Sequence, residues 1–278
     1  MVDARAHPAW DWDLGSGDPP LAGPLLGAAR DAVSCASPGV AVAFSGGVDS
    51  ALLAVLCRDA GLRPVLVTVG FPGSRDMRAA EGAGRLLGCP HVFGRITPGS
   101  LAEAARGAGD PTTVYSRAAF AHVARAASGA GAGEIITANG IDELFCGYDA
   151  FRREHHLGGA HLERMMASRL GRERAMLAAA CGALDVPALH PFMSARFEER
   201  AMQVPVHEKI TGGDDAYRKH PARYVAMRAG VPRTYYTRLK IALQYGTRIS
   251  AELRRGRGAP SGTPTSQGRG PRQGAPPA

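Results

Sequence analysis

The hydrophobic and polar positions in the first half of the chain predict short buried strands that alternate with helices. Residues 39–44 are almost entirely apolar, as expected of a parallel strand buried on both faces, and residues 51–56 have helix-forming composition. Similar patterns predict strands at 63–70, 91–96 and 134–137 and helices at 76–87 and 113–127. Strands that alternate with helices form a parallel sheet covered on both faces, with ligands beyond the carboxyl ends of the strands. The sequence therefore predicts an α/β fold with a parallel sheet flanked by helices.

The strand patterns end near residue 140. Helical patterns then occupy residues 160–181, 194–203 and 216–229, separated by breaks that contain Pro or Gly. We therefore predict a helical C-terminal cap that is continuous with the α/β core. The predicted organisation is an N-terminal extension at 1–37, a core domain at 38–252 and a disordered basic tail at 253–278.

Charge and cysteine content narrow the class of protein. The 278 residues carry a formal net charge of +8, but five arginines lie in the tail from Arg254 onward, which has neither acidic nor aromatic residues. We therefore do not expect a nucleic-acid partner. The five cysteines are scattered without a Cys-x-x-Cys pair, which argues against a disulfide framework or a zinc site. Because no stretch resembles a membrane span or a signal peptide, we expect a cytoplasmic protein without a membrane partner.

A Ser-Gly-Gly-Val-Asp-Ser motif joins the first predicted strand to the helix that follows it. Gly46 and Gly47 allow the backbone to approach an oxyanion, and N–H groups at a helix start point toward such a group. Ser45 and Ser50 add hydroxyl donors. Asp49 repels phosphate, so we expect it to hold a Mg²⁺ ion that bridges to phosphates. The motif resembles the PP-loop of the ATP pyrophosphatase superfamily, whose members split ATP between the α and β phosphates. The alternative is a glycine-rich turn with a Ser/Asp helix cap.

Three later segments resemble the synthetase domain of asparagine synthetase. They are Thr-Ala-Asn-Gly-Ile-Asp-Glu-Leu-Phe-Cys-Gly-Tyr at 137–148, His-Pro-Phe-Met at 190–193 and Arg-Leu-Lys-Ile-Ala-Leu-Gln-Tyr-Gly at 238–246. Residues 69–76 are also similar to the adenine-side strand and loop of that family. The resemblance covers roughly residues 38–250 and implies the PP-loop fold, which is like that of the adenine nucleotide alpha hydrolases.

The resemblance implies a two-step amide ligase that uses ATP. A carboxylate attacks the α-phosphorus to give an acyl-adenylate and pyrophosphate, and ammonia or another amine then displaces AMP. The positions that match the family's adenosine contacts are Ala43, Val69, Thr137 and Ala138. Lys240 matches a late lysine placed over the α-phosphate, with a solvated surface lysine as the alternative. Asp142 matches an aspartate that holds the substrate's amino group, with a favourable helix start as the alternative.

The sequence departs from the family at Asn139, a candidate catalytic position where the family usually has a glutamate that transfers a proton during amide formation. An asparagine cannot take a proton, so another base must serve. Residues 112–115 read Thr-Thr-Val-Tyr where the family has Thr-Thr-x-Arg, although Arg117 is near. Both changes leave the acceptor carboxylate open, with L-aspartate as one possibility.

The nitrogen donor is also open. Residue 2 is Val and the first cysteine is Cys35, so we expect no N-terminal glutaminase domain in this chain. Free ammonia, another amine or a separate glutaminase subunit would then supply the nitrogen. Two other functions compete with this interpretation. One is a PP-loop enzyme that adenylates another substrate, such as a tRNA base for sulfur insertion, and the other is an ATP-binding relative without catalysis.

Overall fold

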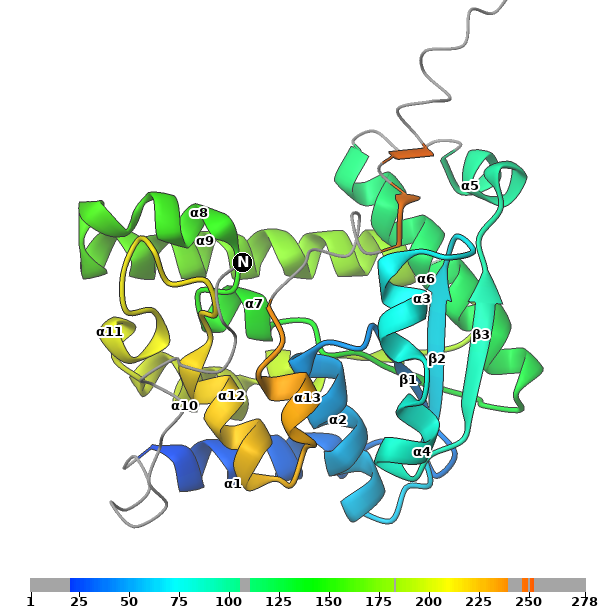
Figure 1. Cartoon of the computed structure of the whole chain (residues 1–278), viewed down its shortest axis with the longest axis horizontal. Helices are drawn as coiled ribbons and strands as arrows, with labels where there is room; N and C mark the ends of the chain where they lie inside the picture. Colours follow the sequence, from blue (N-terminus) through cyan, green and yellow to red (C-terminus); the bar gives the residue numbers. More distant parts are fainter. Residues whose placement is uncertain (1–20, 106–110, 183, 240–246, 250, 253–278) are drawn as a thin grey trace, which may run out of the picture.

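Five parallel strands form one sheet in the order β3-β2-β1-β4-β5 in the computed structural model (Figure 1). The model describes residues 21–105, 111–182, 184–239, 247–249 and 251–252. The strands are β1 (Ala41–Ala43), β2 (Val65–Gly70), β3 (His91–Arg95), β4 (Ile135–Ile136) and β5 (Ala188–Leu189). The chain builds outward from β1 to β3 and then returns to the other side of β1 to form β4 and β5. This reversal places a topological switch point at the ends of β1 and β4, where α/β sheets bind ligands.

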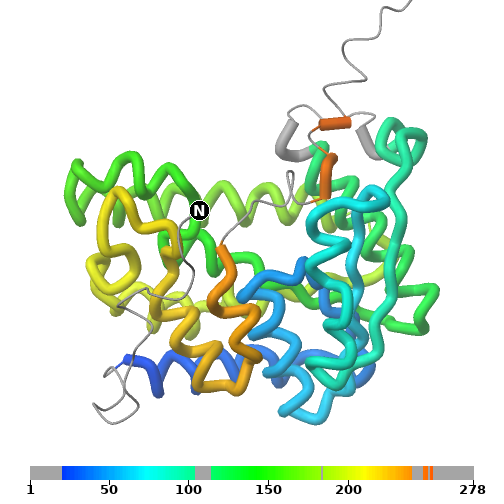
Figure 2. Tube along the Cα trace, viewed as in Figure 1, coloured from blue at the N-terminus to red at the C-terminus, as the bar shows by residue number. Residues whose placement is uncertain are grey.

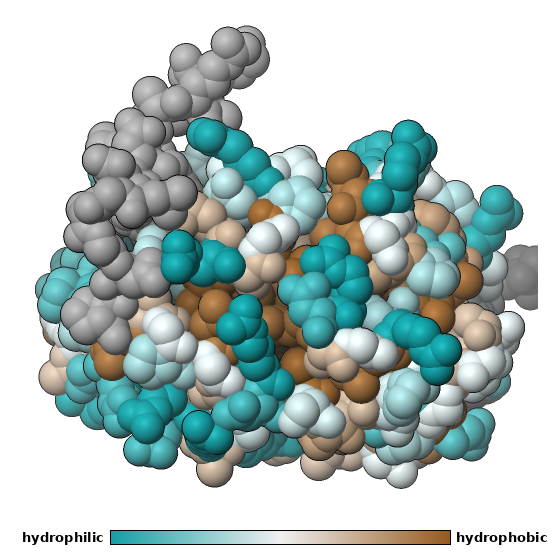
Figure 3. Space-filling model, turned by 90° about the horizontal axis from the view of Figure 1, so that it is seen from below, coloured by the Kyte–Doolittle hydropathy of each residue, from teal (hydrophilic) through white to brown (hydrophobic). Residues whose placement is uncertain are grey.

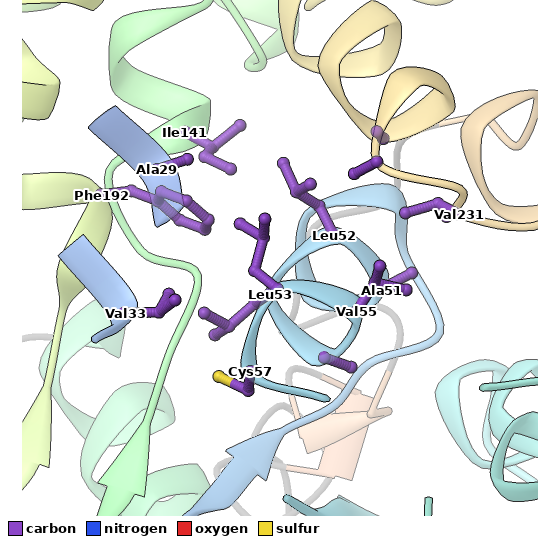
Figure 4. Close-up of a cluster of buried hydrophobic side chains, with 14 of the residues drawn as sticks. Ala29, Val33, Ala51, Leu52, Leu53, Val55, Cys57, Ile141, Phe192 and Val231 are labelled. Atoms are coloured by element: carbon purple, nitrogen blue, oxygen red, sulfur yellow. The ribbon is translucent and has the colours of Figure 1, made fainter. Parts of the chain in front are cut away.

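The two faces of the sheet are covered by different helices. Val42, Leu66 and Ile136 point into one apolar core, which includes helices α1 (Ala22–Val33) and α2 (Val48–Asp59). The alternate strand residues belong to a second core with α5 (Pro98–Ala105) and α6 (Pro111–Gly129). Because both faces are buried, the strands read as continuous apolar runs rather than as alternating ones. Figure 4 shows α1 and α2 side chains converging in the first core with Ile141, Phe192 and Val231.

The C-terminal half is helical and packs on the α1 and α2 side and across the carboxyl ends of the strands. Figures 1 and 2 show the long helix α9 running above the sheet, from α8 toward α6. Its elements are α7 (Ile141–Leu144), α8 (Asp149–Arg153), η2 (His155–Leu157), α9 (Gly159–Cys181), η3 (Pro191–Met193), α10 (Ala195–Gln203), α11 (Val206–Lys209), α12 (His220–Arg228) and α13 (Arg233–Tyr236). The predicted parallel sheet flanked by helices, with a helical C-terminal half, is therefore confirmed.

The structure differs from the sequence-based prediction in several places, and helices α1 and α5 are among the elements that were not predicted. The helix expected at 76–87 is divided into α3 (Arg75–Ala80) and α4 (Ala83–Leu87), because Gly82 has a φ of 77° and leaves the helical conformation. The helix expected at 216–229 begins only at residue 220. The edge strand β5 was not predicted, because two residues carry no periodic pattern.

The predicted domain limits stay predictions. The segment expected to be an N-terminal extension contains α1, whose buried side chains Leu25, Ala28, Ala29 and Val33 belong to the first core. Residues 253–278, the predicted tail, lie outside the described residues. No helix in the described part of the chain combines the length and apolar character that crossing a membrane requires. Figure 3 shows the face below that of Figure 1, where hydrophobic side chains are interspersed with hydrophilic ones.

Candidate functional site

The Ser-Gly-Gly turn leaves the carboxyl end of β1 and ends at Gly47, the residue before α2. The Ser50 hydroxyl is buried and donates to the Gly47 carbonyl at 3.2 Å, and it accepts the backbone N–H of Ser45 at 3.3 Å. Gly46 has a φ of 73°, and a Cβ there would lie 2.9 Å from the carbonyl oxygen of Ala79. Only glycine fits this position without a shift of α3. The turn therefore has the closed, glycine-dependent shape of an anion cradle at a helix start.

Two arginines of the C-terminal half stabilise this turn, one by direct contact and one through the segment that carries the first. Arg238 donates from Nη1 to the Gly46 carbonyl at 2.7 Å. Arg223 is fully buried, and its guanidinium donates to the backbone carbonyls of Tyr217, Arg218, Tyr236 and Arg238. Burial lowers the pKa of Arg223 to about 10, so the group stays charged at neutral pH. The arginine pair fixes the segment that carries Arg238 relative to the PP-loop.

Lys219 joins the PP-loop to the Asp-Glu-Leu-Phe segment. Its Nζ lies 2.6 Å from Asp49 Oδ2 and 2.6 Å from Asp142 Oδ1, and its side chain is 1% exposed. The residue sits directly before α12 with a φ of 57°, a left-handed conformation that costs free energy in a non-glycine residue. Its ammonium bridges two carboxylates, one from the segment after β1 and one from the segment after β4.

This ion cluster explains a glycine of the motif at 137–148. A Cβ at Gly147 would lie 2.0 Å from Asp142 Oδ1 and 2.7 Å from Lys219 Cε. Neither atom can move away without separating the lysine from its carboxylate. Gly147 is therefore required by the close approach of the backbone to the ion cluster.

Asp49 is suited to hold a Mg²⁺ ion. Its second oxygen, Oδ1, is buried and has no hydrogen-bond partner among the described residues. A buried carboxylate oxygen needs a donor or a cation. Asp142 provides a second carboxylate at the same point. The described residues contain no group of three His, Cys, Asp or Glu side chains that could hold a metal ion, whereas Mg²⁺ commonly takes one or two carboxylates together with substrate phosphates.

Glu143 is a buried acid next to this cluster. It is 2% exposed, and Tyr148 donates a short hydrogen bond from its hydroxyl to Glu143 Oε1. Burial and, to a smaller extent, the neighbouring carboxylates of Glu173 and Asp142 together raise the pKa of Glu143 to about 7, although the hydrogen bond from Tyr148 lowers it. The Tyr148 ring is in turn covered by the Arg169 guanidinium, 5.0 Å from the ring centre.

Asn139 faces a carboxylate from a distant element. Its side-chain amide donates from Nδ2 to Glu173 Oε1 at 2.6 Å, and Glu173 lies on α9. Both side chains are half-buried. The position where the family has a glutamate is thus in direct contact with a glutamate supplied by another helix.

Most of the predicted site residues meet in one cleft, which has a volume of about 780 Å³ and lies between the sheet ends, α6 and α9. Those that line it are Ala43, Ser45, Asp49, Ser50, Val69, Thr137, Ala138, Asn139 and Asp142. Gly46 and Gly47 line two smaller recesses on the other side of the loop. Tyr115 also lines the main cleft and Arg117 does not. Lys240 lies outside the described residues, so its predicted role stays a prediction.

The His-Pro-Phe-Met segment contacts the same cleft through Thr137. The Thr137 hydroxyl and His190 Nδ1 are 2.7 Å apart, which ties the residue after β4 to the residue after β5. Burial lowers the pKa of His190 to about 4, so the imidazole is neutral at pH 7. The two sequence motifs therefore form one structural unit at the sheet edge.

Sequence analysis missed three residues of this site: Lys219, Arg223 and Glu173. The helical pattern at 216–229 placed Lys219 inside a helix, whereas it precedes α12. Glu173 belongs to a charged helix whose pattern does not show which side faces the cleft. The one available signal for it was the missing carboxylate at position 139, which required a replacement from elsewhere in the chain.

Comparison with known proteins agrees with the motifs. A family model described as asparagine synthase matches residues 25–189. Asparagine synthetase B [glutamine-hydrolyzing] of Escherichia coli (strain K12) is 25% identical over 193 residues, which cover 62% of this chain and 35% of that protein. The chain thus spans about a third of the length of this relative. The solved structure of NMN synthetase from Francisella tularensis aligns with a TM-score of 0.43 at 14% identity, over 88% of this chain and 97% of that one.

Proposed function

The chain belongs to the asparagine synthase family, and from that premise we propose that it is an ATP-dependent amide ligase that forms AMP and pyrophosphate. One observation carries the proposal. Asp49 of the PP-loop and Asp142 of the Asp-Glu-Leu-Phe segment meet at Lys219, and both line the cleft that also contains Asn139 and Glu173. The residues that we propose for binding phosphates and those that we propose for the reacting carboxylate and amine thus line one cavity.

The first proposed step activates a carboxylate. An oxygen of the acceptor bonds to the α-phosphorus of ATP, and the bond from that phosphorus to the β-phosphate breaks, which releases pyrophosphate. Ser45, Ser50 and the N–H groups at the start of α2 hold the leaving pyrophosphate. Asp49 would hold a Mg²⁺ ion, which would neutralise part of the phosphate charge. Lys240 is proposed at the α-phosphate on the strength of its family position.

The second proposed step forms the amide. The nucleophile is ammonia or another amine, from solution or from a separate glutaminase subunit. The acceptor is a small carboxylic acid, with L-aspartate as one candidate. Asp142 would hold the acceptor's amino group if the acceptor is an amino acid. Its carboxylate is 17% exposed and lines the cleft while contacting Lys219.

Product analysis tests the proposal. The purified chain is incubated with ATP, Mg²⁺ and a panel of acids that includes L-aspartate and L-glutamate, with and without ammonium chloride. We expect AMP and pyrophosphate, and an amide only when ammonium is present. With an acid labelled by ¹⁸O in its carboxylate, one label should appear in AMP, because the attacking oxygen leaves with the phosphate. ADP and phosphate as products, or unlabelled AMP, would contradict the proposal.

A parallel reaction with glutamine in place of ammonium distinguishes the two nitrogen donors. We expect glutamine to give no amide when it replaces ammonium, because the proposed chemistry of this chain needs a free amine. Amide formation from glutamine by the purified chain would show that this chain carries a glutaminase activity of its own.

A further inference from the structure

The carboxylate opposite Asn139 is in position to do what an asparagine cannot. Asn139 donates its amide N–H to Glu173 Oε1 at 2.6 Å, and both side chains line the cleft with Asp49 and Ser50. An asparagine has no proton-accepting group at neutral pH, but its amide can orient a carboxylate. We propose that Glu173 is the general base of the amide-forming step and that Asn139 is its positioning residue, an inference that rests on the ligase function proposed above.

The chemistry of amide formation calls for such a base. The ammonia nitrogen bonds to the acyl carbon of the adenylate and becomes positively charged. One of its protons passes to a Glu173 carboxylate oxygen, the carbon–oxygen bond to AMP breaks, and the AMP phosphate keeps the electron pair. A positioned base contributes about 10²- to 10⁴-fold to the rate of such a transfer. The carboxylate accepts up to about four hydrogen bonds, so the contact with Asn139 orients it without saturating it.

Other acids that line the cleft are less suited to this role. Asp49 and Asp142 each lie 2.6 Å from the Lys219 ammonium, so both carboxylates are already engaged in the ion cluster. Glu143 and Asp76 are buried, at 2% and 6% exposed, and Glu143 also accepts the Tyr148 hydroxyl. Glu173 is only half-buried, which leaves its carboxylate at the cleft surface.

Charged side chains from two helices lie near Glu173. Arg169 and Arg172 come from its own helix α9, and Asp142 and Glu143 come from α7, which packs against it. Glu173 thus faces groups of both signs beside the reacting atoms.

The test separates the two half-reactions in the variant Glu173→Gln. The acceptor is L-aspartate, or the acid of the panel above that releases most pyrophosphate. We expect ATP–pyrophosphate exchange within about threefold of the unaltered chain, because adenylation does not use Glu173. Amide formation from ammonium should fall at least about 10²-fold, as expected for the loss of a general base. Hydroxylamine, a stronger and less basic nucleophile, should still give a hydroxamate at nearly the original rate.

Relocating the carboxylate sharpens the test. Asn139→Glu alone would set two carboxylates within hydrogen-bond distance and should lower amide formation. The double variant Asn139→Glu/Glu173→Gln returns a single carboxylate to the family position, with an amide as its partner. We expect it to recover amide formation to within about tenfold of the unaltered chain. Glu163→Gln, an exposed acid on the same helix outside the cleft, is the matched control and should leave both half-reactions unchanged.

Each result bears on the proposal. Normal ammonium-dependent amide formation in Glu173→Gln would overturn it. Equal loss of exchange and amide formation would overturn it as well, because Glu173 would then bind the acceptor or ATP. No exchange by the unaltered chain with any acid of the panel would overturn the ligase function itself and the role of Glu173 with it.

Discussion

Two cations on the PP-loop side of the cleft are fully buried and paired, whereas the charged groups that α9 contributes to the cleft are half-buried or exposed. Lys219 and Arg223 are both fully buried and make short contacts to carboxylates or backbone carbonyls. Across the cleft, Glu173 is half-buried and Arg172 is exposed. Buried, paired charges suit the stabilisation of a leaving pyrophosphate in the proposed reaction, because they are held in place by several partners. The more open α9 side is where we propose that the acceptor and the amine bind, and it includes Asn139, at which this chain departs from the family.

Breaking the ion cluster should produce the largest effect. In Lys219→Met, Asp49 and Asp142 lose the ammonium between them, and the free energy of unfolding should fall by about 3–5 kcal/mol, as for other broken buried ion pairs. Urea denaturation measures it. The matched control is Lys209→Met, a second fully buried lysine, whose Nζ contacts Met166 Sδ at 3.7 Å and whose pKa burial lowers to about 8.

Replacing Lys209 removes a charge that burial disfavours, so that variant should be neutral or more stable. Similar losses of stability in the two lysine variants would contradict the conclusion that Lys219 stabilises the fold through its two carboxylate partners.

Asp49→Asn tests the nucleotide side without removing volume. Turnover should fall by about 10²- to 10³-fold, in line with the loss of one strong electrostatic stabiliser. The measurement is pyrophosphate release at saturating ATP and Mg²⁺. Asp59→Asn on the same helix changes an exposed ion pair with Arg58 and should have no effect on turnover. If the turnover of Asp49→Asn stays within tenfold of that of the unaltered chain, the proposed role of Asp49 in binding Mg²⁺ is contradicted.

Lys240→Ala separates a catalytic lysine from a structural one. A charge that acts mainly in the transition state affects turnover more than ground-state binding, so we expect turnover to fall at least about tenfold with little change in ATP affinity. Unlike Lys219→Met, this variant should keep its urea midpoint. Loss of ATP affinity at unchanged turnover would make Lys240 a binding residue, and no change at all would make it a surface lysine.

The last prediction concerns the pH dependence of the free energy of unfolding, to which His190 contributes. Its pKa falls from 6.5 to about 4 on folding, so the unfolded chain binds more protons between these values. The free energy of unfolding should therefore fall as pH drops from 6.5 to 4, by about 2 kcal/mol for this residue after allowance for partial exposure. Thermal unfolding at pH 7 and 4.5 should show a smaller difference in His190→Asn. His91, whose pKa burial also lowers to about 4, contributes a separate share that His91→Asn should remove.

The sequence by itself determined the parts of the protein that depend on neighbours along the chain. The strand at 41–43, the Ser-Gly-Gly turn and the start of α2 follow from a short apolar run, two glycines and a helix-forming segment, and the structure has them where they were predicted. The positions predicted to contact adenosine, which are Ala43, Val69, Thr137 and Ala138, also meet in one cleft, because parallel strands end at the same edge of the sheet.

Tertiary structure alone decided which charged groups face one another. Lys219 is separated from Asp49 by 170 residues, and Glu173 from Asn139 by 34. Nothing in a helical pattern distinguishes a lysine that will be buried between carboxylates from one that will be solvated. The physical reason is that a buried charge is tolerated only where partners from other elements surround it, and those partners are assembled only when the helices have packed on the sheet.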